Sequence, residues 1–283
     1  MFLRDIRLIV SDLDGTLLSP DHSLSEHVAG TIRQYVKEGG LFTVATGRPY
    51  RTAMPVIQEL GIDIPVILSN GAVLAEGGRV LERYCLSVKD IADMLLDFHL
   101  MGLSVLLFRE HEIQTFARTE EIEAYEHKER VSCSVISARS SRWTAGELEK
   151  VILIGNLLAF NTVWDRWESV HRHAVSPFQS EADYVELVSG QVSKGFMLQR
   201  LSSTLGIEAG RIMAIGNQMN DLSMLQLAGI GVSVANSPIE LQMASDYVSQ
   251  ASYGEGVIEA INRFVHGGKG IWKYGDWPIE DIR

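Results

Sequence analysis

The sequence predicts an α/β protein: a doubly wound, parallel-sheet core with an α+β domain inserted into it. Short apolar runs alternate with helical patterns in both terminal parts of the chain, as in sheets whose parallel strands are buried on both faces. Between these parts, strand patterns follow one another with few helices, which indicates α+β structure. The chain of 283 residues has room for both parts. The expected core is therefore Rossmann-like, and the insertion is called the cap below.

The first part of the core is expected over residues 1–81. Three short apolar runs there, of which Leu8-Ile9-Val10 is the clearest, predict strands. Two stretches with helical spacing, each followed by glycine, predict helices. The strands are expected at residues 6–11, 41–45 and 66–68, and the helices at residues 25–38 and 49–60.

The cap is expected over residues 82–187. Its strand patterns are closely spaced, and we expect the paired strands to be antiparallel because few helices separate them. The helices are expected at residues 89–100, 120–127 and 161–173, and the strands at 103–108, 112–117, 131–136, 151–154, 174–179 and 184–188.

The second part of the core is expected over residues 188–265, where strands and helices alternate again. The C-terminal tail, residues 266–283, fits neither pattern and has no predicted role. In this part, helices are expected from 193 to 205 and at 222–227, 238–244 and 256–265, and strands at 211–215 and 231–234.

Composition excludes several classes of protein. The 36 Asp and Glu against 25 Lys and Arg give a net charge of −11, which opposes binding to nucleic acid or an anionic membrane. No apolar run approaches the ~20 residues of a membrane span, and Arg4, Asp5 and Arg7 interrupt the stretch where a signal peptide is apolar. Two cysteines are too few for a disulfide framework. We expect a cytoplasmic protein that binds neither nucleic acid nor a membrane; its oligomeric state is left open.

Two carboxylates follow the first predicted strand, in the run Asp12-Leu13-Asp14-Gly15-Thr16. Residues two apart in an extended chain point to the same side, so Asp12 and Asp14 are expected to face one crevice. Open α/β sheets bind ligands in the crevice beyond the carboxyl ends of their strands. The simpler interpretation is a turn, since Asp and Gly are common in turns. A calcium loop is excluded because its sixth and twelfth positions hold Leu17 and Ser23.

The second predicted core strand ends in Thr46-Gly47-Arg48. A hydroxyl and free backbone amides at a helix start suit an anion, because these N–H groups lack partners within the helix. Capping of the helix by Thr46 is the simpler explanation of this triplet alone. Ser69-Asn70-Gly71, which follows the third strand, is interpreted as a turn.

Two further signals lie after the cap. Lys194 stands near the start of a predicted helix, where a positive charge opposes the helix dipole; a functional role is therefore weighed against that of an ordinary solvated lysine. The run Gly216-Asn217-Gln218-Met219-Asn220-Asp221 places two Asn side chains and a carboxylate in a strand-to-helix loop. Capping explains one of these polar side chains but not all of them.

Taken in order, these motifs resemble those of the haloacid dehalogenase superfamily of phosphatases. The pattern consists of DxDGT from Asp12, TGR from Thr46, a lysine after a long insertion, and GxxxND ending at Asp221. The insertion between the second and third motifs is similar to the large cap of the Cof-type sugar-phosphatase branch. The resemblance covers residues 6–265.

This resemblance implies a Mg²⁺-dependent phosphomonoester hydrolase that acts on small phosphorylated metabolites, sugar phosphates among them, through an aspartyl phosphate. Asp12 is implied as the nucleophile, and Asp14 as the general acid and then the base. The implied phosphate contacts are Thr46, Gly47, Arg48, Lys194 and Asn220, and the implied metal site comprises Asp12, the Asp14 carbonyl, Asn217 and Asp221.

One position departs from the family pattern. The fourth-motif loop of the Cof branch reads G-D-x-x-N-D, and its first acid is a direct Mg²⁺ ligand; here that residue is Asn217. An amide oxygen ligates a hard cation without bringing negative charge, so we expect weaker Mg²⁺ binding through Asn217. The alternative is that Asn217 only caps the helix. Two other functions stay open: a catalytically weak sugar-phosphate-binding protein, and a phosphomutase with the same nucleophile.

Overall fold

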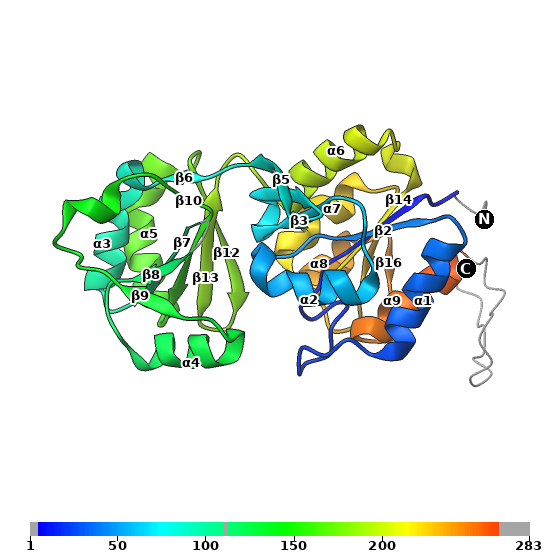
Figure 1. Ribbon diagram of the computed structural model, residues 1–283, viewed down its shortest axis with the longest axis horizontal. Helices are drawn as coiled ribbons and strands as arrows, with labels where there is room; N and C mark the ends of the chain where they lie inside the picture. The colour runs from blue at the N-terminus through cyan, green and yellow to red at the C-terminus, as the bar shows by residue number, and fades with distance from the viewer. Residues whose placement is uncertain (1–4, 110–111, 266–283) are drawn as a thin grey trace.

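The computed structural model describes residues 5–109 and 112–265, which form two bodies side by side (Figure 1). One body holds both ends of the described chain and a parallel sheet; the other is formed by the middle of the chain and has its own sheet. Two chain segments connect them. The tail at residues 266–283 lies outside the described residues.

A five-stranded parallel sheet forms the first body. Its strands are β1 (Leu8–Ser11), β2 (Leu41–Val44), β14 (Ile212–Gly216), β15 (Ile230–Ser233) and β16 (Tyr247–Val248). They lie in the order β16-β15-β14-β1-β2, and the sequence analysis assigned all but the short edge strand β16. Since β1 has β14 on one side and β2 on the other, the strand order reverses at β1. Ligands bind at such a reversal in open α/β sheets.

Helices cover both faces of this sheet. They are α1 (Glu26–Lys37), α2 (Tyr50–Leu60), α6 (Lys194–Leu205), α7 (Leu222–Leu227), α8 (Ile239–Ala244) and α9 (Tyr253–Phe264), with short 3₁₀ turns η3 (Ala209–Arg211) and η4 (Met219–Asp221). Ile9 of β1 packs with α1, α2 and α9, whereas Leu8 and Val10 pack with α6 and α7. Alternate residues of a strand point to opposite faces, so burial on both faces requires the continuous apolar run. The doubly wound core is confirmed.

A small antiparallel sheet extends the core beside β2. Its elements are β3 (Val66–Leu68), the 3₁₀ turn η1 (Ser69–Gly71), β4 (Val73–Glu76) and β5 (Arg79–Arg83). A single parallel bridge between Ala45 and Ile67 joins β3 to the core sheet. β4 and β5 were not expected from the sequence, although Gly77-Gly78, where both residues have positive φ, is a hairpin signal.

The second body contains a six-stranded sheet. Its elements are β6 (Leu86–Ser87), α3 (Val88–Leu100), β7 (Ser104–Phe108), β8 (Ile113–Thr115), α4 (Glu120–Glu129), β9 (Cys133–Val135), η2 (Ser141–Thr144), β10 (Glu147–Leu148), β11 (Lys150–Ile154), α5 (Leu157–His171), β12 (Val175–Glu181) and β13 (Tyr184–Ser189). The strand order is β12-β13-β11-β7-β8-β9, with β6 and β10 paired separately. Helices α3 and α5 pack on one face of the sheet, and α4 packs on part of the other.

Two expectations for the cap are corrected. Pairing is not antiparallel throughout, because β8 and β9 are parallel; α4 connects them as a crossover, which parallel neighbours require. Helix α5 begins at Leu157 rather than at residue 161, because the Asn156 side chain caps it by accepting from the Leu158 N–H.

We propose that the chain divides into a core of residues 1–81 plus 188–265 and a cap of residues 82–187. Separate apolar clusters support this division, one around the parallel sheet and one between the cap sheet, α3 and α5. β5 ends at Arg83 and β13 ends at Ser189, so each proposed boundary lies two residues before the end of a strand.

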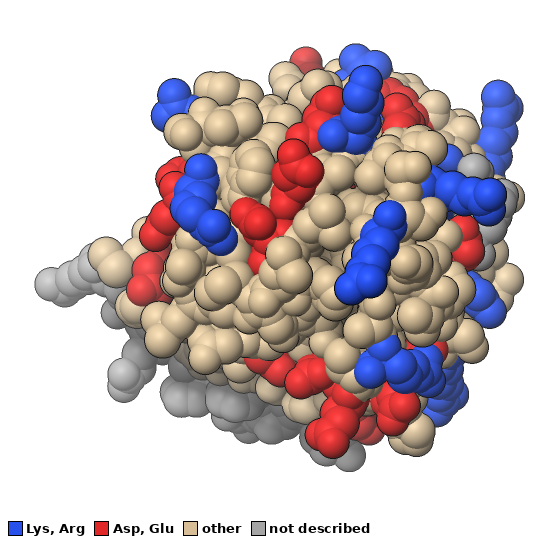
Figure 2. Space-filling view, turned by 90° about the vertical axis from the view of Figure 1, so that its left-hand side faces the viewer, with Lys and Arg blue, Asp and Glu red and all other residues tan. Residues whose placement is uncertain are grey.

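The described residues show a mixed-charge surface at the cap end. On the face in Figure 2, Lys and Arg are separated by Asp and Glu rather than gathered into one positive area. Within residues 5–109 and 112–265, no helix combines the length and the apolar character that crossing a membrane requires.

Candidate active site

The carboxylates of Asp12 and Asp14 stand at the end of β1, where the strand order reverses. The Asp12 N–H extends the sheet by donating to the Ile215 carbonyl at 2.9 Å, and Leu13 is anchored in the core cluster. The chain then turns at Gly15, whose φ of +80° is left-handed; a Cβ there would lie 2.3 Å from the Asn217 side chain. Local sequence thus directs both carboxylates into one crevice.

Lys194 binds two carboxylates at once. Its Nζ lies 2.6 Å from Asp12 Oδ1 and 2.6 Å from Asp221 Oδ1, and all three side chains are buried. Burial and the helix N-terminus at α6 both oppose a positive charge on Lys194. The two ion pairs outweigh burial and raise the pKa of Lys194 above its ordinary value. A charged lysine at a helix start is therefore explained by its partners.

Asp12 has one carboxylate oxygen, Oδ2, that Lys194 does not bind, whereas both carboxylate oxygens of Asp221 accept hydrogen bonds. Burial raises the pKa of Asp12 to about 7, the charges of Asp221 and Asp14 add to the rise, and Lys194 opposes it. Asp221 Oδ2 accepts from the main-chain N–H groups of Asn217 at 2.8 Å and Gln218 at 3.0 Å. Both Asp221 oxygens are thus engaged, so Asp221 holds the fourth-motif loop from behind rather than facing a ligand.

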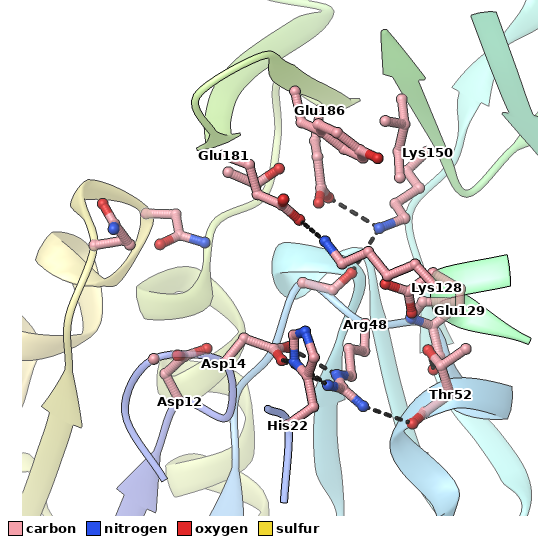
Figure 3. Close-up of a pocket in the computed structure, with 18 of the residues that line it drawn as sticks. Asp12, Asp14, His22, Arg48, Thr52, Lys128, Glu129, Lys150, Glu181 and Glu186 are labelled. Carbon is pink, nitrogen blue, oxygen red and sulfur yellow. Dashed lines mark hydrogen bonds and ion pairs between the residues drawn. The ribbon is translucent and has the colours of Figure 1, made fainter. Parts of the chain in front are cut away.

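Asp14 is held by Arg48 in a bidentate pair. Arg48 Nε donates to Asp14 Oδ2 at 2.7 Å and Nη2 donates to Oδ1 at 2.6 Å, while His22 Nδ1 lies 3.0 Å from Oδ1 (Figure 3). Burial opposes ionisation of Asp14, but these hydrogen bonds outweigh it and hold its pKa well below the ordinary value. In this pairing Asp14 is an ionised hydrogen-bond acceptor.

The loop at residues 46–48 leaves one amide free. Thr46 Oγ1 accepts from the Arg48 N–H at 3.0 Å, so its side chain caps the turn and is buried. The Thr46 carbonyl accepts from the Asn70 N–H at 3.0 Å. A trans peptide directs its N–H away from its carbonyl, and the Gly47 N–H has no hydrogen-bond acceptor within the described chain. This amide is available to an anion.

A cavity of about 380 Å³ lies between these loops and the cap (Figure 3). Six of the site residues singled out in the sequence contribute to its wall: Asp12, Asp14, Gly47, Arg48, Asn217 and Asn220. Thr46, Lys194 and Asp221 lie behind that wall. A cavity of this volume suits a small ligand.

None of the cap residues of the cavity was singled out in the sequence, and neither were His22 and Thr52 of the core. These cap residues come from α4 and from three strands, and no local motif marks them, because only tertiary packing brings them to the core loops. They are Tyr125, Lys128, Glu129, Lys150, Ile152, Ser180, Glu181, Tyr184 and Glu186.

Three core groups form a set of oxygen donors: the Asp12 carboxylate, the Asp14 carbonyl and the Asn217 amide. The inward atom of the Asn217 amide lies 3.2 Å from Asp12 Oδ2 and 3.0 Å from the Asp14 carbonyl. With Oδ1 inward, these separations are close to the ~3.0 Å between neighbouring ligands of an octahedron whose Mg–O bonds are ~2.1 Å. With the amide reversed, Nδ2 donates to the same two groups and to Thr16 Oγ1.

The donor set therefore fits a hard cation such as Mg²⁺, with a carboxylate, a main-chain carbonyl and an amide oxygen. In the part of the chain that the structure describes, no group of three or more His, Cys, Asp and Glu side chains is placed to bind a metal. The only carboxylate directly in the set is that of Asp12, since Asp221 is engaged elsewhere.

Comparison with known proteins agrees with this geometry. Residues 9–261 match the family model of haloacid dehalogenase-like hydrolases. The chain is 28% identical over 279 residues to the phosphatase YwpJ of Bacillus subtilis, covering 89% of this chain and 97% of that protein. It is 31% identical over 245 residues to the HMP-PP phosphatase of Serratia proteamaculans, covering 83% and 86%.

A solved structure of a haloacid dehalogenase-like hydrolase from B. subtilis has the same fold, with a TM-score of 0.81 at 25% identity over 92% of this chain and 100% of that one. The motif order, the fold and these relatives agree, and the resemblance seen in the sequence is confirmed. The chain therefore belongs to the haloacid dehalogenase-like hydrolase family and is a phosphatase.

Proposed function

We propose that this phosphatase is Mg²⁺-dependent and hydrolyses phosphomonoesters of small metabolites, sugar phosphates among them, through an aspartyl phosphate on Asp12. One observation carries the proposal: the buried Asp12 carboxylate has Lys194 on one oxygen and a set of cation-fitting oxygens at the other. The cavity above it has the volume of a small-molecule site.

Charge neutralisation is the main task at Asp12. A carboxylate that approaches a phosphate is repelled by ~1 kcal/mol per pair of charges at 4 Å in water, and by several-fold more in a drier site. Lys194 offsets part of that repulsion from behind Asp12. Mg²⁺, held by Asp12, the Asp14 carbonyl and Asn217, would supply further positive charge against the phosphate oxygens. Asp221 keeps the Asn217 loop in place for this purpose.

The phosphate is bound by groups that face the cavity. The free Gly47 N–H and the Arg48 guanidinium are the proposed contacts, with Asn220 beside them. Thr46 and Lys194 lie behind the wall, so we assign them to holding the loop and the nucleophile instead of touching the phosphate directly.

Proton transfer is assigned to Asp14. Hydrolysis in two steps needs a residue that first gives a proton to the leaving oxygen and later takes one from water. Paired with Arg48, Asp14 has no proton to give. We therefore propose that Arg48 exchanges the Asp14 carboxylate for the substrate phosphate. Without Arg48, burial raises the pKa of Asp14, so that its carboxylate takes up a proton from water as the substrate binds. Asp14 then gives this proton to the leaving oxygen and later takes one from the attacking water.

A cytoplasmic location is part of the proposal. Cys85 and Cys133 are both free thiols, as is usual in a reducing compartment.

A phosphate-release screen over a panel of phosphorylated metabolites, with Mg²⁺ and with EDTA, tests the proposed function. We expect Mg²⁺-dependent release from a subset of the panel. Transfer of phosphate to a second hydroxyl without release would identify a phosphomutase. Thermal stabilisation by a metabolite without turnover would identify a binding protein.

A further inference from the structure

We infer that the cap supplies a buried ion pair, Lys150 and Glu186, that holds the phosphate-binding loop of the core in its binding conformation. Both are positioning residues, and the inference rests on the proposed function of Gly47 as a phosphate contact. The inference gives the cap a part in the binding of phosphate itself.

The pair lies on the face of the cap sheet that is turned to the core. Ile152, two residues after Lys150, stands opposite Glu186 in the β11–β13 ladder, so the two charged side chains share one face. Lys150 Nζ lies 3.0 Å from Glu186 Oε2, and the residues are only 3% and 7% exposed. Burying two charges carries a large desolvation cost, which is offset only by good geometry and further hydrogen bonds.

Those further hydrogen bonds reach the core. Lys150 Nζ donates to the Gly47 carbonyl at 2.8 Å (Figure 3). Glu186 Oε2 accepts from Asn70 Nδ2 at 2.9 Å. The Asn70 side chain also accepts from Asn220 Nδ2 at 2.9 Å. One cap ion pair is therefore connected to the second motif, to η1 and to the fourth motif.

The turn η1 is strained and needs support from outside. Its residues Ser69, Asn70 and Gly71 have φ values of 49°, 56° and 96° in succession. A non-glycine residue in this region is energetically unfavourable and persists only where its surroundings hold it. A Cβ at Gly71 would lie 2.3 Å from the Ser193 carbonyl, so the turn is pressed against the start of α6. Glu186 and Asn220 fix its central side chain from two sides.

Together, η1 and Lys150 hold all three carbonyls of the loop at residues 46–48. The Thr46 carbonyl accepts from the Asn70 N–H and the Arg48 carbonyl from the Ser69 N–H, each at 3.0 Å, while the Gly47 carbonyl accepts from Lys150. Peptides beside glycine reorient with little steric resistance. With its carbonyls held in this way, the loop keeps the conformation in which Gly47 lines the cavity and its N–H has no hydrogen-bond acceptor within the described chain.

Removing both charges of the cap pair tests the inference. In Lys150→Met/Glu186→Gln, we expect the affinity for inorganic phosphate to fall by roughly tenfold, the scale of a lost hydrogen bond to a charged group. Calorimetric titration of the full-length protein with inorganic phosphate in Mg²⁺ measures it. The KM for p-nitrophenyl phosphate should rise by a similar factor while kcat changes less, because the lost support acts on binding.

Arg118→Met/Glu126→Gln is the matched control, since this pair also lies in the cap, with Arg118 Nη1 2.9 Å from Glu126 Oε1, but outside the cavity. Its phosphate affinity should equal that of the wild type. Asn70→Ala is a second variant, which cuts the connection to η1 while leaving the ion pair intact and should also weaken phosphate binding.

Wild-type phosphate affinity in both the double variant and Asn70→Ala, with folding verified by circular dichroism, would overturn the inference. Failure of the proposed function gives a different result: a wild-type protein that binds inorganic phosphate but releases none from any ester. A wild-type protein that does not bind inorganic phosphate overturns both.

Discussion

The core wall and the cap wall of the cavity are built from charges in different surroundings. On the core side, Asp12 of the wall is bound from behind by Lys194, which is 1% exposed and also binds Asp221. On the cap side, the side chains of Lys128 and Glu181 pair while 29% and 46% exposed. A buried ion pair resists displacement because breaking it strands a charge, whereas an exposed pair exchanges partners at little cost. We therefore expect the core wall to fix the chemistry and the cap wall to accommodate different substrates.

Lys150 and Glu186 are the exception on the cap side, because they are buried and contact core loops. Their behaviour should follow that of the core wall. We therefore expect burial and contacts with core loops, rather than a position in the core or the cap, to determine how firmly a charged pair is held.

Asp12→Asn should have the largest effect on activity. The amide keeps the shape of the side chain but removes the nucleophile, so turnover should fall by ~1,000-fold or more. The fold should survive, since Lys194 retains Asp221 as a partner. Phosphate release and circular dichroism measure the two effects, and Asp63→Asn, at an exposed position, is the control. Substantial residual activity would contradict the covalent mechanism.

Lys194→Met should have the largest effect on stability. Two buried carboxylates, Asp12 and Asp221, would lose their shared counter-charge, at a cost of ~3–5 kcal/mol in the free energy of unfolding. Lys37→Met, on the exposed side of α1, should change it by less than ~0.5 kcal/mol. Urea unfolding compares the two variants, and equal midpoints would show that the core wall is not fixed by this charge network.

Asn217→Asp should strengthen Mg²⁺ binding and lower the free energy of unfolding of the metal-free protein. The added charge faces the metal, so affinity should rise by ~tenfold and half-maximal activity should need less Mg²⁺ without loss of turnover. Without metal, a second carboxylate would face Asp12 Oδ2 and the Asp14 carbonyl in place of an amide donor. This should reduce the free energy of unfolding by ~1–3 kcal/mol.

Calorimetry with Mg²⁺ alone and urea unfolding in EDTA measure these opposite effects of Asn217→Asp. Gln218→Glu adds the same charge at the neighbouring exposed position, outside the donor set, and is the control. Unchanged Mg²⁺ affinity in Asn217→Asp would place residue 217 outside the metal site.

Glu181→Gln should have the smallest effect. It removes one charge from the exposed part of the cap wall, so turnover of p-nitrophenyl phosphate should change by less than ~threefold. The ratio of kcat/KM between metabolites of the panel should change more, because their hydroxyl or ring substituents face the cap. Equal ratios in variant and wild type would show that the Lys128–Glu181 pair does not contribute to substrate selection.

Sequence reasoning was accurate where a signal is local. The apolar run of β1 and the glycines that follow α1 and α2 each fix an element within a few residues of chain. The motif residues also lie where parallel strands end, and topology alone brings those ends together. The sequence indicated a functional role for Lys194 only weakly. The structure explains this residue by its ion pairs with Asp12 and Asp221.

Tertiary features could not be predicted in the same way. Ser69-Asn70-Gly71 was interpreted as a turn, and it is one, but its strain and its contacts with Glu186 and Asn220 depend on three separate parts of the chain. Neither Lys150, which directly precedes the strand expected at residues 151–154, nor Glu186, within the strand expected at 184–188, was singled out in the sequence. Their pairing depends on the register between β11 and β13 and on how the cap meets the core.

Chemical trapping at Asp12 tests the mechanism most directly. Acid quenching during turnover, followed by borohydride reduction, converts an aspartyl phosphate into homoserine, and peptide mass mapping locates it. We expect homoserine at position 12 in the wild type with substrate and Mg²⁺, and none without substrate. Rapid phosphate release with no homoserine at position 12, or with homoserine at another aspartate, would contradict phosphoryl transfer through Asp12.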